Sequence, residues 1–352
     1  MKQNLIAKRA ATALCGLLAA FALTRNALAS TVELAADSVD GLASAIASAG
    51  AGGTVLVKRG MHSESGTVLV NIPVSIVGEK GAVIKSGTSP SLGAYPLTIQ
   101  PVLHIQNASD VKVQRISFLP SAVTANCAVL IDNSPRTKIL ENEINGFQFG
   151  VFSQSGDHVL IIGNRINTSQ QSDLPETDGI IVNNGPGVEV ADNDVSGAGS
   201  ADSSTIYSTG IFVGGRQGYA HNNSASGCKW GFFACHNKPG TYKDEAGSDL
   251  AGEVPSKGWL VQDNRAMGNA WGYFIVDGAN NNVWFNNAAS RNRQFDIYLG
   301  GAVVPIYGPL PTSRNNLVVQ DSHRRLHRQL TVKDCGLENV ILGNVILSTD
   351  CP

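Results

Sequence analysis

The chain has 352 residues, of which 43% are apolar and 15% are charged, and its formal net charge is -2. This apolar content is enough to offset the entropy lost on folding, so the composition excludes an intrinsically disordered protein. The near balance of 26 basic and 28 acidic residues also argues against a protein that binds nucleic acid through bulk charge.

The first 29 residues have the pattern of a secretory signal peptide. A basic opening precedes an apolar stretch over residues 10–23, and Ala27-Leu28-Ala29 offers small residues to a signal peptidase. The apolar stretch is too short to span a membrane comfortably. We therefore predict a signal peptide over residues 1–29 and a single domain over residues 30–352, secreted or periplasmic and without a membrane anchor.

The mature chain begins with one short helical pattern and continues in short β segments. Residues 40–50 have an acidic start, alanines and apolar residues in the middle and a glycine stop, which predicts a short helix. From Thr54 onward the segments are three to five residues long, and no helical period separates them. This pattern predicts an all-β domain.

Asparagine recurs after these β segments and reveals an internal repeat. Asn142 and Asn164 are 22 residues apart, and the later steps equal this unit plus insertions. The residues that we assign to the row are Asn142, Asn164, Asn193, Asn222, Asn264, Asn286, Asp321 and Asn344. Asparagine tolerates the left-handed backbone of a tight turn, and its amide can bond to the asparagine one coil away.

A second feature keeps the same register, namely a glycine followed by three mostly apolar residues. It begins at Gly150, Gly179, Gly210, Gly231 and Gly272, and Asp296 takes the place of glycine in the next copy. Strands this short, at this spacing, can stack coil upon coil about 4.8 Å apart, each pairing in parallel with its copy above and below.

This repeat resembles the pectin-lyase-like superfamily, and its short units are similar to those of periplasmic copper-accessory and carbohydrate-binding members. The resemblance covers residues 54–346. It implies a single-stranded right-handed parallel β-helix, with the helix at residues 40–50 as a cap on the first coil. Copper chemistry is disfavoured because no histidine and cysteine cluster has ligand spacing, and the carboxylate cluster of the calcium-dependent members is not found. We therefore predict neither a metal nor a cofactor.

Cysteine usage is compatible with disulfides in an exported protein. Without Cys15, which lies in the signal peptide, five cysteines remain, so at least one thiol stays free in a monomer. We favour a pair between Cys335 and Cys351, which bracket the last 16 residues, over one between Cys228 and Cys235.

The alternation of side chains predicts one outward-facing row on the strands that follow the repeated glycine. Four insertions, at residues 168–178, 196–209, 237–257 and 301–312, flank these strands and would make a walled groove. In the pectin-lyase-like superfamily the polysaccharide cleft lies over this sheet. The predicted row is His104, Leu130, Phe152, Ile181, Phe212, Phe233, Phe274 and Tyr298, of which Phe152, Phe212, Phe233 and Phe274 are predicted to bind substrate.

Few polar residues fall beside this row, and they are our candidates for chemistry. Elimination needs a base to take the proton alpha to a carboxylate and a charge to stabilise the enolate. Lys229 or His236, which we expect beside Asp277, could be the base. The stabilising charge would come from Arg216 or Arg293, the proton donor would be Tyr298, and Asp178 is a further predicted substrate-binding residue.

These features leave three functions open. The first is an exported carbohydrate-active lyase or epimerase that acts on a polysaccharide or oligosaccharide. The second is an enzyme of the lyase, cyclase or isomerase type whose smaller apolar or aromatic substrate lies on the Phe/Tyr row. The third is a non-catalytic binding or surface protein that only presents the groove.

Overall fold

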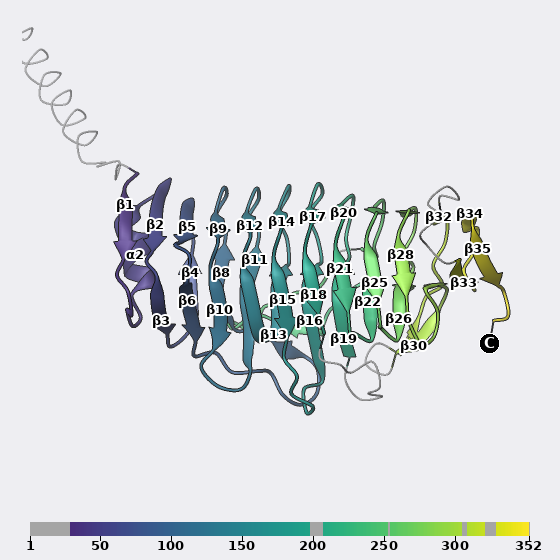
Figure 1. Cartoon of the computed structure of the whole chain (residues 1–352), viewed down its shortest axis with the longest axis horizontal. Helices are drawn as coiled ribbons and strands as arrows, with labels where there is room; N and C mark the ends of the chain where they lie inside the picture. Colours follow the sequence, from purple (N-terminus) through teal and green to yellow (C-terminus); the bar gives the residue numbers. More distant parts are fainter. Residues whose placement is uncertain (1–28, 198–206, 253, 305–307, 321–328, 352) are drawn as a thin grey trace, which may run out of the picture.

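The computed structural model describes residues 29–197, 207–252, 254–304, 308–320 and 329–351. Figure 1 shows these residues wound into an elongated solenoid whose coils follow one another from the N-terminal to the C-terminal end. The predicted signal peptide lies outside the described residues except for its last residue. In the described part of the chain, no helix is long and apolar enough to cross a membrane.

One wall of the solenoid is a sheet of 12 strands within the described residues, here called sheet A. Its strands pair in parallel and in register, with one residue of each short strand buried and its neighbours turned outward. The strands, in stacking order, are β1 (Thr31–Leu34), β2 (Gly53–Val57), β5 (Val74–Gly78), β9 (Lys112–Gln114), β12 (Lys138–Leu140), β14 (Leu160–Ile162), β17 (Glu189–Ala191), β20 (Tyr219–His221), β24 (Leu260–Gln262), β27 (Val283–Phe285), β32 (Leu317–Gln320) and β34 (Val340–Gly343).

The other walls belong to a sheet of 19 strands in the described residues, sheet B, which forms two faces joined by β13 (Glu143–Ser153). Besides β13, face B1 contains β3 (Gly60–Glu64), β6 (Ala82–Ser86), β10 (Ser117–Pro120), β15 (Arg165–Thr168), β18 (Asp194–Ser196), β21 (Ser224–Ser226), β25 (Arg265–Met267) and β28 (Ala288–Ser290). Besides β13, face B2 contains β4 (Val68–Val70), β8 (Pro101–Gln106), β11 (Ala125–Asp132), β16 (Glu176–Val182), β19 (Tyr207–Val213), β22 (Trp230–Ala234), β26 (Trp271–Ile275), β29 (Ile297–Leu299), β33 (Leu330–Asp334) and β35 (Val345–Ser348).

Two small sheets lie in the segments that connect the coils. β7 (Leu97–Thr98) pairs in parallel with β23 (Tyr242–Lys243), although these strands are far apart in the sequence. β30 (Ala302–Val304) and β31 (Gly308–Leu310) form an antiparallel pair. The predicted all-β parallel solenoid is therefore confirmed.

The repeated glycines stack as one column beside the interior of face B2. Gly150, Gly179, Gly210, Gly231 and Gly272 follow one another from coil to coil. A Cβ atom on Gly179 would lie 2.3 Å from the Val195 side chain of face B1 and 2.7 Å from the Gly210 carbonyl oxygen. The glycines are therefore required because the two faces approach too closely here for any side chain.

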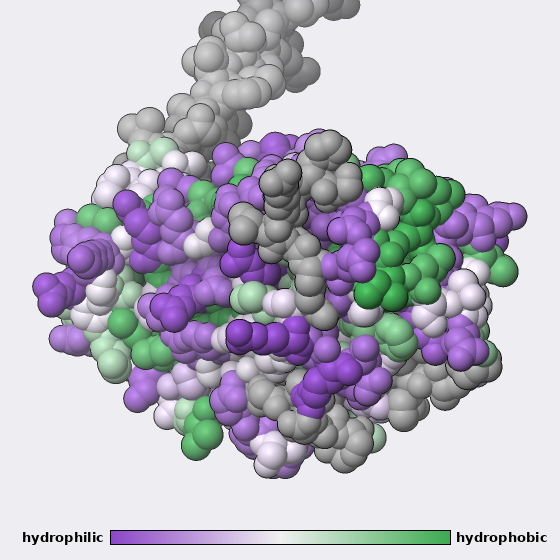
Figure 2. Space-filling model, turned by 45° about the vertical axis from the view of Figure 1, so that its right-hand side comes forward, coloured by the Kyte–Doolittle hydropathy of each residue, from purple (hydrophilic) through white to green (hydrophobic). Residues whose placement is uncertain are grey.

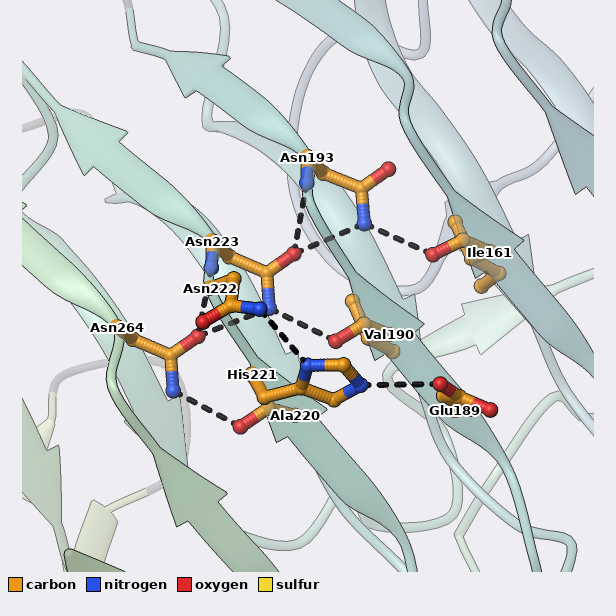
Figure 3. Close-up of polar contacts among 9 residues, drawn as sticks. All are labelled: Ile161, Glu189, Val190, Asn193, Ala220, His221, Asn222, Asn223 and Asn264. Atoms are coloured by element: carbon orange, nitrogen blue, oxygen red, sulfur yellow. Dashed lines mark hydrogen bonds and ion pairs between the residues drawn. The ribbon is translucent and has the colours of Figure 1, made fainter.

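A ladder of buried asparagines joins the coils between sheet A and face B1. Asn193, for example, donates from its backbone N–H and its Nδ2 to the Asn223 Oδ1, at 3.0 and 2.9 Å, and also from Nδ2 to the carbonyl oxygen of Ile161 (Figure 3). The same pattern links Asn142, Asn164, Asn193, Asn223, Asn264 and Asn287.

The predicted ladder was correct in kind but wrong by one residue at two places. The members are Asn223 and Asn287, whereas Asn222 and Asn286 occupy the preceding turn with positive φ angles of 56° and 52°. Asn344 instead accepts a hydrogen bond from Gln329 at an exposed position, and Asp321 lies outside the described residues. A second ladder through Asn282, Asn316 and Asn339 was not predicted.

The N-terminal end of the solenoid is capped by a helix, as predicted. Helix α2 (Leu42–Ala49) buries Leu42, Ala45, Ile46 and Ala49 against the first coil. Its N-cap is Gly41, and the carboxylate of Glu64 accepts a hydrogen bond from the backbone N–H of Leu42 at 3.0 Å. This contact ties the first turn of the helix to β3.

The C-terminal end is closed by the predicted disulfide between Cys335 and Cys351. The less favoured pair does not form, because Cys228 and Cys235 are buried free thiols, as is Cys127. The last coil remains partly uncovered, and Figure 2 shows an apolar area toward this end of the molecule. Its exposed apolar side chains are Leu337, Val340, Leu342, Ile346 and Leu347.

Candidate functional site

The predicted outward row exists on face B2. The strand registers join His104, Leu130, Phe152, Ile181, Phe212, Phe233, Phe274 and Tyr298 from coil to coil. The row's apolar side chains belong to a hydrophobic cluster that is separate from the cluster inside the solenoid. Phe274 and Tyr298 stack with their ring centres 5.2 Å apart. The rings therefore lie outside the winding, as alternation predicts.

The expectation of an open groove over this row was wrong. Phe212, Phe233 and Phe274 are only 3%, 2% and 5% exposed. Leu97 and Ile99, which precede β8, and Tyr242, Leu250 and Leu310, which lie in later insertions, pack into the same cluster. The connecting segments thus fill the space over the row, which is how a soluble protein usually treats a long apolar stripe.

The segment after β22 is held down along its length by polar contacts. Asn183 donates to the Leu250 carbonyl oxygen and Gln154 donates to the Ala251 carbonyl oxygen, at 2.9 and 2.7 Å. The Oε1 of Glu245 lies 2.7 Å from the Nδ1 of His104. This segment is therefore a fixed cover on face B2 rather than a wall beside it.

A pair of carboxyl groups lies under this cover, at the edge of face B2 where its strands begin. Glu176 and Asp178 are two residues apart on β16 and share a side-chain hydrogen bond, and their register partners Tyr207 and Phe149 belong to the outer cluster. They are only 3% and 2% exposed. Thr209 donates its backbone N–H to the Oδ1 of Asp178 at 2.8 Å, and Tyr95 donates its hydroxyl to the Oε2 of Glu176 at 2.7 Å. Tyr242 also contacts Glu176 by a side-chain hydrogen bond.

Burial raises the pKa of both carboxyl groups. It raises the pKa of Glu176 to about 7, against the hydrogen bonds from Tyr95, Tyr242 and Asp178 that favour the ionised form. The pKa of Asp178 lies well above its ordinary value because of burial and, next, because of the neighbouring charge on Glu176. Burial and the closeness of the two groups therefore disfavour two adjacent negative charges at this place.

Lys229 lies at the same edge of face B2, just before β22. Its Nζ is 4.3 Å from the centre of the Tyr207 ring and 5.3 Å from that of the Trp230 ring. Tyr207 is the register partner of Glu176 and stacks on Trp230 at 5.7 Å. The Lys229 side chain is half-buried, and burial lowers its pKa.

Two further coils extend this edge toward the C-terminal end. Trp271 is the register partner of Trp230, and Phe295 stacks on Trp271 with a centre-to-centre distance of 5.9 Å. The Nζ of Lys333 lies 5.4 Å from the Phe295 ring, and Trp271, Phe295 and Lys333 are half-buried. We call this line the aromatic edge; it consists of Tyr207, Trp230, Trp271 and Phe295 with Lys229 and Lys333.

Three predicted catalytic residues lie at the opposite edge of face B2, where its strands end. Arg216 is exposed in the turn after β19, and His236 and Asp277 follow β22 and β26. The expected contact between His236 and Asp277 is replaced by others. His236 is hydrogen-bonded to the Gly252 carbonyl oxygen at 2.7 Å, and Asp277 pairs with the Nζ of Lys238 at 3.4 Å. These residues do not converge on Lys229.

Tyr298 and Arg293 lie on a coil of face B2 near the C-terminal end of the solenoid. The hydroxyl of Tyr298 donates to the Gly301 carbonyl oxygen at 2.6 Å, and burial raises the pKa of this tyrosine. Arg293 is exposed two residues before Phe295. Of the predicted polar residues, the structure therefore brings Lys229 and Asp178 to one edge and places Arg293 along the same edge.

Sequence reasoning missed Glu176, Tyr95 and Tyr242. The sequence Glu176-Thr177-Asp178 was assigned to an insertion, but β16 begins at Glu176, so its alternating acids are strand residues. Among the described residues, no group of three or more histidine, cysteine or acidic side chains could hold a metal ion.

Comparison with known proteins supports the fold. A family model described as a right-handed beta helix region matches residues 102–245. No curated protein matches the sequence.

Several solved structures have similar backbones. The mannuronan C-5 epimerase AlgE4 A-module of Azotobacter vinelandii is 12% identical, with a TM-score of 0.49 and coverage of 85% of this chain and 90% of that one. An alginate lyase from Paenibacillus sp. str. FPU-7 is 14% identical (TM-score 0.44; 90% and 99% covered). A polygalacturonase from Erwinia carotovora ssp. carotovora is 11% identical (TM-score 0.46; 91% and 96% covered). The strand registers and the family match together identify this chain as a right-handed parallel β-helix, the fold implied by its resemblance to the pectin-lyase-like superfamily.

Proposed function

We propose that this chain is an exported carbohydrate-active enzyme that removes the proton alpha to a carboxylate in an acidic polysaccharide or oligosaccharide. Lyases and epimerases share this first step. In a lyase, the electrons of the broken C–H bond expel the neighbouring glycosidic oxygen and leave an unsaturated ring. In an epimerase, a proton returns to the same carbon from the other side.

The observation that carries the proposal is the aromatic edge. Its aromatic faces can lie against the C–H groups of sugar rings, and its two lysines can pair with carboxylates. Successive coils are about 4.8 Å apart, so the line follows the long axis of the solenoid and suits an extended chain. Trp271, Phe295 and Lys333 are half-buried, so part of this line is open to a ligand without movement of the cover.

Lys229 is the base in this proposal. Its lowered pKa increases the fraction of neutral amine that can accept a proton near neutral pH. Glu176 lies two coils from Lys229, with its register partner Tyr207 on the coil between them, and its pKa of about 7 allows it to give or take a proton in the same range. Lys229 and the pair of Glu176 and Asp178 together supply a proton acceptor and a proton donor at one edge of face B2.

The two other predicted functions receive less support. A small apolar substrate would need the Phe152-to-Phe274 row to be open, and that row is filled by the covering segments. A purely binding role does not require a buried carboxyl pair with raised pKa values. Export follows from the sequence of residues 1–29 alone and belongs to the proposal.

Substitution of Lys229 separates its possible roles. We expect Lys229→Ala to lower kcat/KM on an acidic polysaccharide by about 10² to 10⁴, the usual contribution of a general base. Lys229→Arg keeps the positive charge but not the base, so it should keep KM while kcat falls. The assay is the ultraviolet absorbance of unsaturated products, followed by NMR of the sugar configuration.

Lys112→Ala is the matched control, because Lys112 lies on the outer surface of sheet A, away from face B2. It should leave both constants unchanged. Full turnover by Lys229→Ala would contradict the assignment of the base, and retained binding without any turnover in the wild-type chain would favour the binding protein instead.

A further inference from the structure

A polar depression of about 260 Å³ lies over the first coils of the solenoid, at the N-terminal end of face B2. It is formed where the turns after β3 and β6 meet the segment before β8 and the covering segment after β22. The side chains that line it are Ser65, Thr67, Thr88, Ser89, Gln100 and Glu245.

The carboxylate in this depression is held by a buried histidine. His104 is 3% exposed, and its Nδ1 lies 2.7 Å from the Oε1 of Glu245. Burial raises the pKa of Glu245, but the hydrogen bond to His104, a backbone hydrogen bond and the charge interaction with His104 together outweigh burial, so the pKa lies below its ordinary value. The Nε2 of His104 is buried without a hydrogen-bond partner in the described part of the chain. Glu245 is therefore an oriented anion that remains 32% exposed.

The chemistry of the lining selects one class of ligand. Hydroxyl groups both donate and accept, the Gln100 amide does the same, and Glu245 accepts. No lysine or arginine lines the depression in the described residues, so an anion would meet only the charge of Glu245. The abundance of polar groups disfavours an apolar ligand. A neutral molecule with several hydroxyl groups matches this set best.

The depression is distinct from the aromatic edge. His104 and Phe212 are four coils apart in the outward row, which corresponds to about 19 Å, and Phe212 shares β19 with Tyr207, the first member of the aromatic edge. The volume of the depression, about 260 Å³, lies just below the roughly 300 Å³ at which pockets for drug-sized ligands begin. A single sugar ring therefore fits better than a chain.

We propose that this depression binds one uncharged sugar ring, with Glu245 accepting hydrogen bonds from the sugar hydroxyls and the Ser65, Thr67, Thr88 and Ser89 hydroxyls completing the contacts. The site discriminates against uronic acids, which is the opposite preference to that of the aromatic edge. It does not depend on the proposed reaction, because binding here requires no turnover.

The test is ligand-observed NMR on the full chain, with the methyl glycosides of glucose, galactose and mannose as probes and glucuronic and galacturonic acids for comparison. We expect at least one neutral glycoside to bind and the uronic acids to bind at least tenfold more weakly. Glu245→Gln should weaken the neutral glycoside about tenfold, because a charged acceptor becomes a neutral one.

A second variant is needed because Glu245→Gln also changes the contact that holds the covering segment to His104. Thr67→Val with Ser89→Ala removes two exposed hydroxyls that line the depression, and should also weaken binding about tenfold. Lys229→Ala is the control and should leave this binding unchanged even if it abolishes turnover. The proposal is overturned if no neutral glycoside binds, if both Glu245→Gln and the double variant bind like wild type, or if a uronic acid binds as tightly as the neutral probes.

Discussion

Replacement of Asn223 with alanine is expected to lower the free energy of unfolding by about 3–5 kcal/mol, whereas Asn222→Gly should change it by less than about 1 kcal/mol. The two residues are neighbours in the sequence but differ completely in environment. Asn223 is 1% exposed and lies inside the ladder, while Asn222 is exposed in a turn with a positive φ angle that glycine adopts freely.

The expected loss at Asn223 comes from several buried groups that would lose partners together. Its Oδ1 accepts from the backbone N–H and the Nδ2 of Asn193, and its Nδ2 donates to the Val190 carbonyl oxygen and the Asn264 Oδ1 (Figure 3). Each unsatisfied buried donor or acceptor costs about 1–3 kcal/mol, and partial relaxation of the coil lowers the total.

Urea denaturation of the wild type and the two variants, followed by circular dichroism, measures this difference. Equal stability of Asn223→Ala and Asn222→Gly would contradict the ladder as a source of stability. Because this ladder fixes the register of consecutive coils, its loss at one coil should also lower the cooperativity of unfolding, seen as a smaller m-value.

Between about pH 5 and pH 8 the protein is expected to lose about 3 kcal/mol of stability through Glu176. Burial raises the pKa of Glu176 from its ordinary value of 4.5 to about 7 in the folded chain. The folded state therefore binds more protons than the unfolded state in this interval. Stability is fully present below pH 4.5, decreases as the pH rises, and the loss is complete above pH 7.

Glu176→Gln should remove the part of the slope that comes from Glu176, because the amide keeps the shape of the carboxyl group and carries no charge, while the raised pKa of Asp178 leaves a residual slope. The variant should be more stable than the wild type at pH 8 and closer to it at pH 5. Thermal unfolding at pH 5, 6, 7 and 8 measures the effect, with the exposed Glu143→Gln as the control. A slope in Glu176→Gln as steep as that of the wild type would show that Glu176 does not titrate in this range.

The coil pattern was predictable because it is local. A strand of three to five residues, a turn and a fixed asparagine recur in every unit, so the stacking direction and the outward row follow from spacing alone. The one-residue error at Asn223 and Asn287 has a physical cause. Consecutive asparagines share a turn, and only the backbone shows which one takes the left-handed conformation and which one is buried.

The site was only partly predictable because its contacts cross long stretches of sequence. His104 and Glu245 are separated by 141 residues, and Tyr95 and Glu176 by 81 residues. No local spacing in the sequence indicates that the segment after β22 pairs with Leu97–Thr98 and covers the outward row. For the same reason, the sequence did not show that the predicted catalytic residues lie at two opposite edges of face B2.

The reaction of the wild-type chain with acidic polysaccharides in D₂O, followed by NMR, tests the proposed function most directly. Alginate and polygalacturonate provide two backbones of uronic acids. We predict proton abstraction beside the carboxylate, seen either as an unsaturated ring or as deuterium at that carbon with inverted configuration, and loss of both signals in Lys229→Ala. New reducing ends without unsaturation or deuterium would identify a hydrolase instead and would contradict the assignment of Lys229 as the base.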